Sequence, residues 1–365
     1  MTAAILVLAL ALAAANGAND VPKTVATLAG AGVARYRTAI VWGTVTTFVG
    51  ALVSLTFAAE LTKLFSKGIF TATPTPEFTL AVLLGTVAWV TFATAARLPV
   101  STTQALVGAM VGAGVLIGAD AVSWRALPEK VLVPAILAIG VAYGISFLLN
   151  LIRFRAPECV CIGVDAPAVA PAAIDASGVA AFSPPPSTTP RLHVEVGTVE
   201  DCRVHGKHGK RLDITVNGLH WLSSGAASAA RGLNDAPKIV AVGAFALVPA
   251  GMSSRSVLLC VAGAMAVGAS LFGTRVARRL GEDVVHMDHV EGCKANLTTA
   301  ALVGLAANRG LPLSTTQVSS GAIAGAAGSH PSRLNGRTLR DFAIAWTVTP
   351  LSAALVAAAV FALLR

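Results

Sequence analysis

Long apolar segments, separated by short polar breaks, make up most of this chain. Seven windows stand out: roughly 2–34, 39–59, 78–96, 131–152, 218–250, 256–274 and 341–364. A helix needs about 20 mainly apolar residues to cross the hydrocarbon core of a bilayer. The pattern therefore predicts an all-α integral membrane protein with several crossings.

A stretch of different composition divides the apolar windows into two groups. Residues 156–214 contain three consecutive prolines at 184–186, an acidic patch and a basic run, a composition that does not span a bilayer. We expect a first transmembrane repeat at 1–155, a water-exposed linker at 156–214 and a second transmembrane repeat at 215–365. The first part of the linker has the composition of a disordered segment, whereas 192–196 and 212–216 alternate as short strands do and predict one or two hairpins.

The two apolar halves carry the same pair of motifs in the same order. Residues 15–26 and 230–241 share eight of twelve positions, and residues 98–104 and 311–317 share six of seven. The offsets between the copies are nearly equal, at 215 and 213 residues. Both motifs therefore belong to one duplicated unit.

The distribution of basic residues predicts the orientation in the membrane. Lys and Arg gather on the cytoplasmic side of membrane proteins, and the predicted topology puts ten of them on one side and six on the other. The ten are Arg35, Arg37, Arg153, Arg155, Arg275, Arg278, Arg279, Arg333, Arg337 and Arg340, and the six are Lys63, Lys67, Arg125, Lys130, Arg255 and Arg365. We expect a multi-pass protein of the cell membrane whose linker is cytoplasmic. Each half then makes an odd number of crossings, which predicts the inverted-repeat architecture of secondary transporters, with broken helices and re-entrant hairpins.

Composition agrees with this class and excludes others. The 365 residues are 55% apolar and 12% charged, with a mean hydropathy of +0.73, whereas soluble domains carry about 25% charged residues. The net charge of +9 comes from basic residues at the ends of apolar runs, so we expect no nucleic-acid partner. Five cysteines do not form the framework of a secreted disulfide scaffold.

The first repeated motif puts charged groups at membrane depth. Asn-Asp is followed by Pro and Lys in both halves: Asn19, Asp20, Pro22 and Lys23, then Asn234, Asp235, Pro237 and Lys238. Because proline lacks a backbone N–H group, we expect each helix to break there and to line a cavity. Carboxylates and ammonium groups at that depth are costly unless they pair or have a function. We expect a functional site; an ion pair that only holds a kinked helix is the alternative.

The second repeated motif is typical of an anion site. Ser-Thr-Thr follows Pro99 and Pro312, at the point where proline favours the opening of a helix. Hydroxyl groups and free backbone N–H groups would gather there at a positive helix N-terminus, where anions bind. The residues are Ser101, Thr102, Thr103 and Gln104 in the first copy, and Ser314, Thr315, Thr316 and Gln317 in the second. Hydroxyls that only cap helix ends are the alternative.

At these residues the chain resembles the inorganic phosphate transporter family, whose hallmark is a Gly-Ala-Asn-Asp-Val motif in each half with Ser-Thr-Thr downstream. Residues 17–21 match the first hallmark fully, and Gly232, Asn234 and Asp235 match the second. The resemblance covers roughly 1–155 and 215–365. It implies a secondary transporter of phosphate coupled to sodium or protons, with no other cofactor. Asn19, Asp20, Asn234 and Asp235 would lie near the coupling cations, and the two Ser-Thr-Thr-Gln segments with Lys23 and Lys238 would bind the anion.

Two departures from the family pattern bear on the coupling ion and the substrate. Lys23 and Lys238 stand where the family often has an amide, so each ammonium group could replace a bound sodium ion. Gln104 and Gln317 stand where the family frequently has histidine, and glutamine does not titrate, which excludes a proton relay at that position. Sulfate transport occurs in a branch of the family, and a site that does not titrate has no obvious means of rejecting sulfate.

Several alternatives remain open at the level of sequence. A sulfate permease of the same family is the runner-up, followed by an anion channel, which the paired aspartates argue against. An enzyme is not expected, because no intramembrane histidine is available to activate Ser101 or Ser314. The partners are phosphate or sulfate and the lipid bilayer, and the sequence leaves a homodimer open.

The linker carries soft metal ligands at unusual spacing. Cys159 and Cys161, with Cys202, His205 and His208, could bind zinc, but Cys-x-Cys is not the usual spacing of a zinc site. Unpaired cysteines in a flexible cytoplasmic segment are the preferred interpretation, and no metal site is assigned.

Overall fold

The structure is a computed structural model that describes residues 1–96, 98, 100–152, 159–165, 191–198, 209–283, 287–326, 332 and 334–365. The chain forms two compact units. One unit combines Met1–Arg153 with His220–Arg365, and the other is Phe154–Leu219. The two apolar halves therefore fold together into a single helical unit, and the segment between them folds separately.

Helices make up the described part of the larger unit. The first half contributes α1 (Thr2–Gly30), α2 (Tyr36–Phe57), the short α3 (Ala59–Lys63), α4 (Pro76–Ala95), α5 (Thr102–Ile117) and α6 (Val133–Leu151). The second half contributes α8 (Val216–Leu247), α9 (Ser254–Asp283), α10 (His289–Asn308), α11 (Thr315–Gly325) and α12 (Gly336–Leu364). Short π-helical turns at Leu64–Gly68 and Leu127–Leu132 and a 3₁₀ turn at Ala119–Ala121 complete the first half.

Six segments of the described chain are long and apolar enough to cross a bilayer. They are Thr2–Gly30, Tyr36–Phe57, Pro76–Ala95, Leu127–Leu151, Ser254–Arg278 and Leu339–Leu364. The predicted window at 218–250 corresponds to α8, which carries the charged residues Arg231, Asp235 and Lys238 in its interior. The prediction of a multi-pass, mainly helical membrane protein is confirmed.

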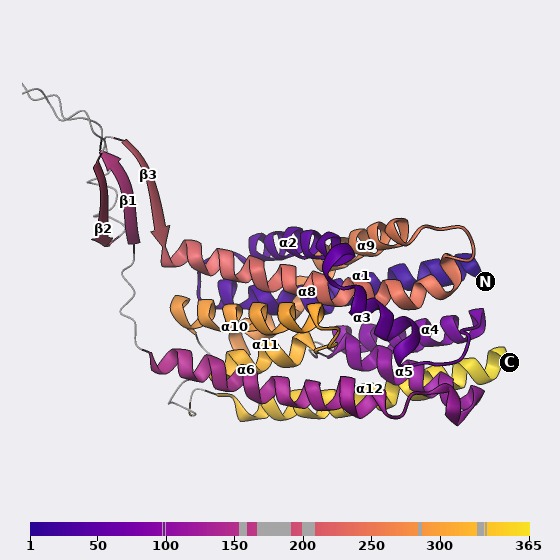
Figure 1. The fold of residues 1–365 in the computed structure, drawn as a ribbon. Helices are drawn as coiled ribbons and strands as arrows, with labels where there is room; N and C mark the ends of the chain where they lie inside the picture. The colour runs from indigo at the N-terminus through magenta and orange to yellow at the C-terminus, as the bar shows by residue number, and fades with distance from the viewer. Residues whose placement is uncertain are drawn as a thin grey trace, which may run out of the picture. The chain divides into compact units, whose positions relative to one another are not determined.

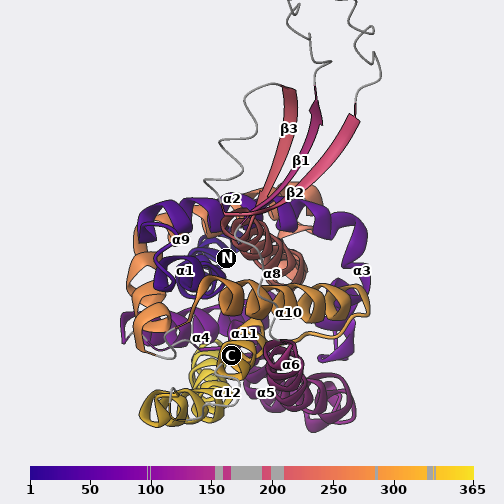
Figure 2. The ribbon, with the colours of Figure 1, turned by 90° about the vertical axis from the view of Figure 1, so that its left-hand side faces the viewer.

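Most helices of the larger unit lie in two layers, each with members from both halves. In both views α1, α2, α8 and α9 lie on one side, which we call the first layer (Figure 1, Figure 2). Helices α5, α6, α11 and α12 lie on the other side and form the second layer. Helix α1 and its sequence equivalent α8 run in opposite directions (Figure 1), as an inverted repeat requires.

Glycines show how closely the two halves pack, and they do so at equivalent positions. A methyl group added at Gly17 of α1 would lie 1.9 Å from the carbonyl oxygen of Met265 in α9. One added at Gly232 of α8 would lie 2.0 Å from the carbonyl oxygen of Thr47 in α2. Only a residue without a side chain permits helix backbones to approach so closely. Each motif helix is thus packed against a helix of the other half.

The predicted break of the motif helices is wrong. Helix α1 continues through Pro22, and α8 continues through Pro237. Neighbouring helices can stabilise a proline-containing helix within a membrane, and Pro22 is packed against α9, where a methyl group at Gly273 would meet its ring at 3.1 Å. The chain is interrupted instead between α4 and α5 and between α10 and α11. Each half therefore has a helical hairpin whose second helix begins at the Ser-Thr-Thr motif.

The smaller unit contains a three-stranded antiparallel sheet with the order β2-β1-β3. The strands are β1 (Cys159–Asp165), β2 (Arg191–Gly197) and β3 (Gly209–Thr215). The two predicted strand segments fall on β2 and β3, but they do not pair with each other. Both pair with β1, which the alternation analysis missed, with Cys161 opposite Glu195 on one side and Asp213 on the other. The part of the linker expected to be disordered lies largely outside the described residues.

Candidate oxyanion site

Both Ser-Thr-Thr motifs open a helix, as the sequence predicts. Ser101 is the N-cap of α5, and its hydroxyl accepts a hydrogen bond from the backbone N–H of Gln104 at 3.2 Å. Ser314 is the N-cap of α11 and accepts from the backbone N–H of Gln317 at 3.3 Å. The serine hydroxyls therefore cap the helices, and the threonines that follow are the groups that reach the first layer.

In the first motif, Lys23 of α1 is surrounded by oxygen atoms. Its ammonium group forms a direct ion pair with Asp20, one turn earlier. It also donates to the side-chain oxygen of Asn19 at 2.6 Å and to the carbonyl oxygen of Val100 at 2.8 Å. A further hydrogen bond goes to the hydroxyl of Thr316 in α11. Lys23 thus connects the first motif to the Ser-Thr-Thr helix of the second half.

In the second motif, Lys238 of α8 makes the equivalent connection in the opposite sense. Its ammonium group lies 3.2 Å from a carboxylate oxygen of Asp235 and donates to the hydroxyl of Thr103 in α5 at 2.6 Å. Each lysine therefore contacts the aspartate of its own motif and the second threonine of the other half. The crossed contacts bring both copies of both motifs into one cluster between the two layers.

Asp20 has further partners in the same cluster. Its carboxylate accepts from the hydroxyls of Thr102 at 2.8 Å and Thr316 at 3.2 Å. The side-chain amide of Asn16 donates to Asp20 at 2.5 Å and to Thr102 at 3.1 Å. Asp20 is thus held by donors from both halves of the chain.

The charged groups of the cluster are withdrawn from water. Asp20 and Lys23 are each 1% exposed, and Asp235 and Lys238 are 3% and 2% exposed. Buried charges require pairing and hydrogen bonding to offset the loss of hydration. The pairing described above meets that requirement for both carboxylate oxygens of Asp20, whereas Oδ2 of Asp235 accepts no hydrogen bond from the described residues.

One charged member of the cluster is absent from the sequence-based set of site residues. Arg231 of α8 is completely buried, donates to the hydroxyl of Thr315 at 3.0 Å and lies 3.5 Å from a carboxylate oxygen of Asp20. An arginine inside an apolar window is itself a signal of function, and it occupies the position of Asn16 in the repeat. That signal could have identified both residues.

The two motif asparagines form hydrogen bonds at the edge of the cluster. The side-chain amide of Asn19 donates to the hydroxyl of Thr94 at 3.0 Å and to the carbonyl oxygen of Leu98 at 3.1 Å. That of Asn234 donates to Asp235 at 2.9 Å and to the carbonyl oxygen of Leu313 at 3.0 Å. The asparagines therefore bind the turns that precede α5 and α11.

The two glutamines lie beside the cluster without completing it. Gln104 and Gln317 each have a buried side-chain oxygen with no hydrogen-bond partner within the described chain. Their backbone N–H groups contact the N-cap serines, as described above. Both residues thus lie in the first turns of α5 and α11, and their side-chain oxygens accept no hydrogen bond from the lysines within the described chain.

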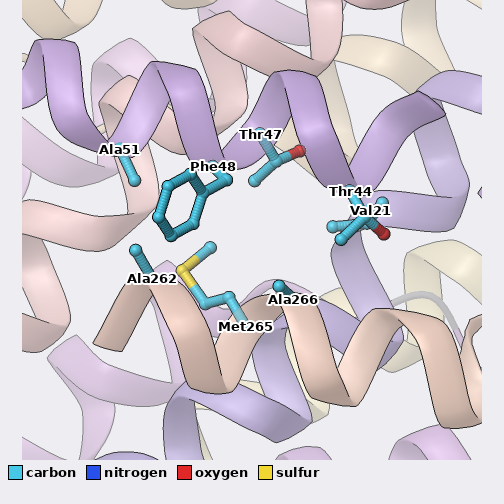
Figure 3. A pocket seen from close by; sticks show the side chains of 8 residues that line it. All are labelled: Val21, Thr44, Thr47, Phe48, Ala51, Ala262, Met265 and Ala266. Carbon is cyan, nitrogen blue, oxygen red and sulfur yellow. The ribbon is translucent and has the colours of Figure 1, made fainter. Parts of the chain in front are cut away.

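A narrow gap, too tight to hold a water molecule, lies beside the first motif, between α1, α2 and α9 (Figure 3). Its lining is Val21, Thr44, Thr47, Phe48, Ala51, Ala262, Met265 and Ala266. The two threonine hydroxyls have no hydrogen-bond partner among the described residues. The lining carries no charged group, so this gap does not resemble an oxyanion site.

The sheet of the smaller unit bears on the metal-ligand prediction. The sulfur atoms of Cys159 and Cys161 and a carboxylate oxygen of Asp213 all lie within 4.8 Å of one another, a spacing that a metal ion could bridge. Cys161 is disulfide-bonded, however, which contradicts the expectation of an unpaired cysteine at this position and leaves Cys161 without a thiolate for a metal. Cys202, His205 and His208, the other predicted ligands, lie outside the described residues.

Comparison with known proteins identifies a family that fits this geometry. The sequence profile of the phosphate transporter family matches residues 16–357. A probable low-affinity inorganic phosphate transporter of Mycobacterium bovis is 28% identical over 99% of this chain and 77% of its own length. One of Bacillus subtilis is 27% identical over 100% of this chain and 97% of its own length.

A solved structure shares the fold. A sodium-dependent phosphate transporter superimposes with a TM-score of 0.78 at 21% identity, over 100% of this chain and 98% of its own. The family match confirms the expected resemblance, and with it the expectation of a transporter rather than an enzyme. The chain belongs to the phosphate transporter family.

Proposed function

We propose that this chain is a secondary active transporter that carries inorganic phosphate across the cell membrane. The observation that carries the proposal is the pair of crossed contacts, from Lys23 to Thr316 and from Lys238 to Thr103. They place two ammonium groups and the N-termini of two helices around one point between the halves. Relatives of the chain are named inorganic phosphate transporters, which favours phosphate as the anion.

The oxyanion would bind between the two layers, near the middle of the membrane. A tetrahedral anion has four oxygens, and the cluster offers threonine hydroxyls from two opposed helices, each at a helix N-terminus where the dipole favours negative charge. The first layer would supply the lysines. Alternating access then requires the two halves to move relative to each other around the site, as inverted repeats do.

We further propose that transport is coupled to a cation, with sodium as the first candidate. A sodium-dependent transporter shares the fold, and Asp20 and Asp235 are the carboxylates available to a cation. In the described structure an ammonium group already contacts each of them. We therefore expect fewer coupling cations per phosphate than a site with two free aspartates would take.

The proposed orientation keeps the linker in the cytoplasm. It follows from the excess of basic residues on that side of the membrane. Under this orientation Lys63 and Arg255 face outward, and Arg37 and Arg337 face inward.

Uptake of labelled phosphate into proteoliposomes tests the function. An inward sodium gradient and a pH gradient are imposed separately, and sulfate is added as a competitor. We expect uptake that responds to the sodium gradient and, because the relatives are named phosphate transporters, uptake that sulfate inhibits poorly. Uptake of sulfate in preference to phosphate would support the sulfate permease, and uptake that accumulates no phosphate against a gradient would support a channel.

A further inference from the structure

Arg231 breaks the near symmetry of the two motifs. The repeats agree at Asn19 and Asn234, at Asp20 and Asp235, and at Lys23 and Lys238, yet Asn16 in the first half is replaced by Arg231 in the second. The substitution adds a positive charge to a helix interior. A completely buried arginine at that position calls for a compensating negative group.

The contact of Arg231 with the start of α11 does not require a charge. Arg231 donates to the hydroxyl of Thr315 at 3.0 Å, and Asn16 donates to the equivalent Thr102 at 3.1 Å. A neutral amide thus performs the same contact in the first half. The guanidinium group therefore has a role beyond holding the start of α11.

The free donors of Arg231 point to that role. The contacts with Thr315 and Asp20 both use Nη1. Nε and Nη2 are buried and donate to no atom of the described residues. Together these two nitrogens form the side edge of the guanidinium group, whose parallel N–H bonds match two oxygens of a carboxylate or phosphate. An unoccupied edge of this kind, inside a cluster of threonines and lysines, is a binding surface for an oxyanion.

The charge balance of the cluster favours the same conclusion. Among its described members, Lys23, Arg231 and Lys238 carry +3, and Asp20 and Asp235 carry −2, which leaves a net charge of +1. Without Arg231 the same cluster would be neutral. One more fixed positive charge lets a divalent oxyanion bind with one coupling cation fewer.

We propose that Arg231 binds the transported oxyanion through its Nε and Nη2 edge and supplies the charge that replaces one coupling cation. The inference rests on the proposed transport of phosphate and adds a residue specific to the second half. It separates two contributions of one side chain, namely the positive charge and the paired N–H groups. Substitutions can remove them one at a time.

Two substitutions form the test, both assayed as phosphate uptake into proteoliposomes over a range of phosphate and sodium concentrations. Arg231→Asn installs the residue of the first half and removes both contributions, and Arg231→Lys keeps the charge but removes the paired donors. Arg255→Asn, at an exposed position outside the cluster, is the matched control. Thermal unfolding of each purified protein is measured in parallel.

We expect Arg231→Asn to raise the KM for phosphate about 10- to 100-fold, the loss that follows removal of a charged donor pair, and to make uptake depend more steeply on sodium. Arg231→Lys should raise KM with the sodium dependence of the wild type, and the control should change neither. If Arg231 had only a structural role, its replacement would lower the unfolding temperature and leave the KM of the folded fraction unchanged.

Unchanged KM in Arg231→Lys, in protein with the unfolding temperature of the wild type, would overturn the proposal even if Arg231→Asn did not fold. Wild-type protein that takes up no phosphate would overturn the proposed function together with this inference. Wild-type uptake with unaffected variants would overturn the inference alone.

Discussion

Replacement of the two motif lysines by asparagine should affect sodium dependence unequally. Lys238→Asn and Lys23→Asn each remove an ammonium group and place an amide where the family pattern often has one. The two aspartates left behind differ in their remaining partners. Arg231 lies 3.5 Å from Asp20, whereas the ion pairs of Asp235 within the described chain involve Lys238 alone.

The structure sets the size of the difference. A unit charge 3.5 Å away attracts Asp20 with about 5 kcal/mol at an effective dielectric constant of about 20. Lys23→Asn therefore leaves Asp20 paired and costs mainly hydrogen bonds, about 1–2 kcal/mol or roughly a 5- to 30-fold loss of transport. Lys238→Asn removes the direct ion pair of Asp235 and leaves it the more distant attraction of Arg231, so the loss approaches the cost of a broken buried ion pair, about 3–5 kcal/mol. That corresponds to a loss of roughly 100- to 4000-fold when no sodium is present.

Sodium should restore transport by Lys238→Asn more than transport by Lys23→Asn. An ion that binds beside Asp235 stabilises the transporting state by about 2.7 kcal/mol when its concentration is 100 times its Kd. Initial rates of phosphate uptake, measured in proteoliposomes from zero to high sodium with choline as the replacement cation, give the sodium stimulation of each variant. We expect sodium to stimulate Lys238→Asn most, Lys23→Asn less and the wild type least.

The reasoning would be refuted by equal sodium stimulation of the two variants. It would also be refuted if Lys238→Asn transported at the wild-type rate without sodium, because Lys238 would then be unnecessary to neutralise Asp235. Circular dichroism and thermal unfolding of both proteins show whether a loss of transport results from unfolding.

Three further predictions concern the site, the packing and the orientation. Thr103→Val removes the hydroxyl that accepts from Lys238 and should weaken phosphate binding by about 1–3 kcal/mol, measured by titration calorimetry. Gly17→Ala should reduce the yield of folded protein in size-exclusion chromatography, because its methyl would lie 1.9 Å from a carbonyl oxygen of α9, whereas Gly263→Ala, which meets no atom within 4 Å, should not. A cysteine at position 63 should react with an impermeant thiol reagent on intact cells and one at position 37 only after permeabilisation; the reverse result would invert the proposed topology.

Much of the architecture could be predicted because it depends on local signals. Apolar windows identify crossing helices, and a Ser-Thr-Thr motif after a proline identifies a helix start, which α5 and α11 confirm at Ser101 and Ser314. Duplication adds strength, because two copies of each motif in the same order single out residues that one copy would leave ambiguous.

The features that sequence reasoning missed depend on contacts between distant segments. Pro22 predicts a break when α1 is considered alone, but α9 packs against it and the helix continues. Lys23 contacts Thr316, which lies 293 positions away along the chain, and no local pattern reveals such a partner. Strand β1 became a central strand only because β2 and β3 lie on both sides of it.

Arg231 was missed for a different reason. A comparison of repeats draws attention to the positions that agree, and Arg231 is a position at which the copies differ. Its burial and its contact with Asp20 make it as much a part of the cluster as the lysines. Differences between repeats can therefore carry functional information when the differing residue is a charge at membrane depth.

The central claim is that both halves of the chain build one oxyanion site. Titration calorimetry of the purified protein with phosphate tests it most directly, with Thr103→Val and Thr316→Val measured under the same conditions. We predict one phosphate bound per chain and weaker binding in both variants, because each removes a hydroxyl from a crossed contact. Two phosphates per chain, or one variant with the affinity of the wild type, would contradict the account.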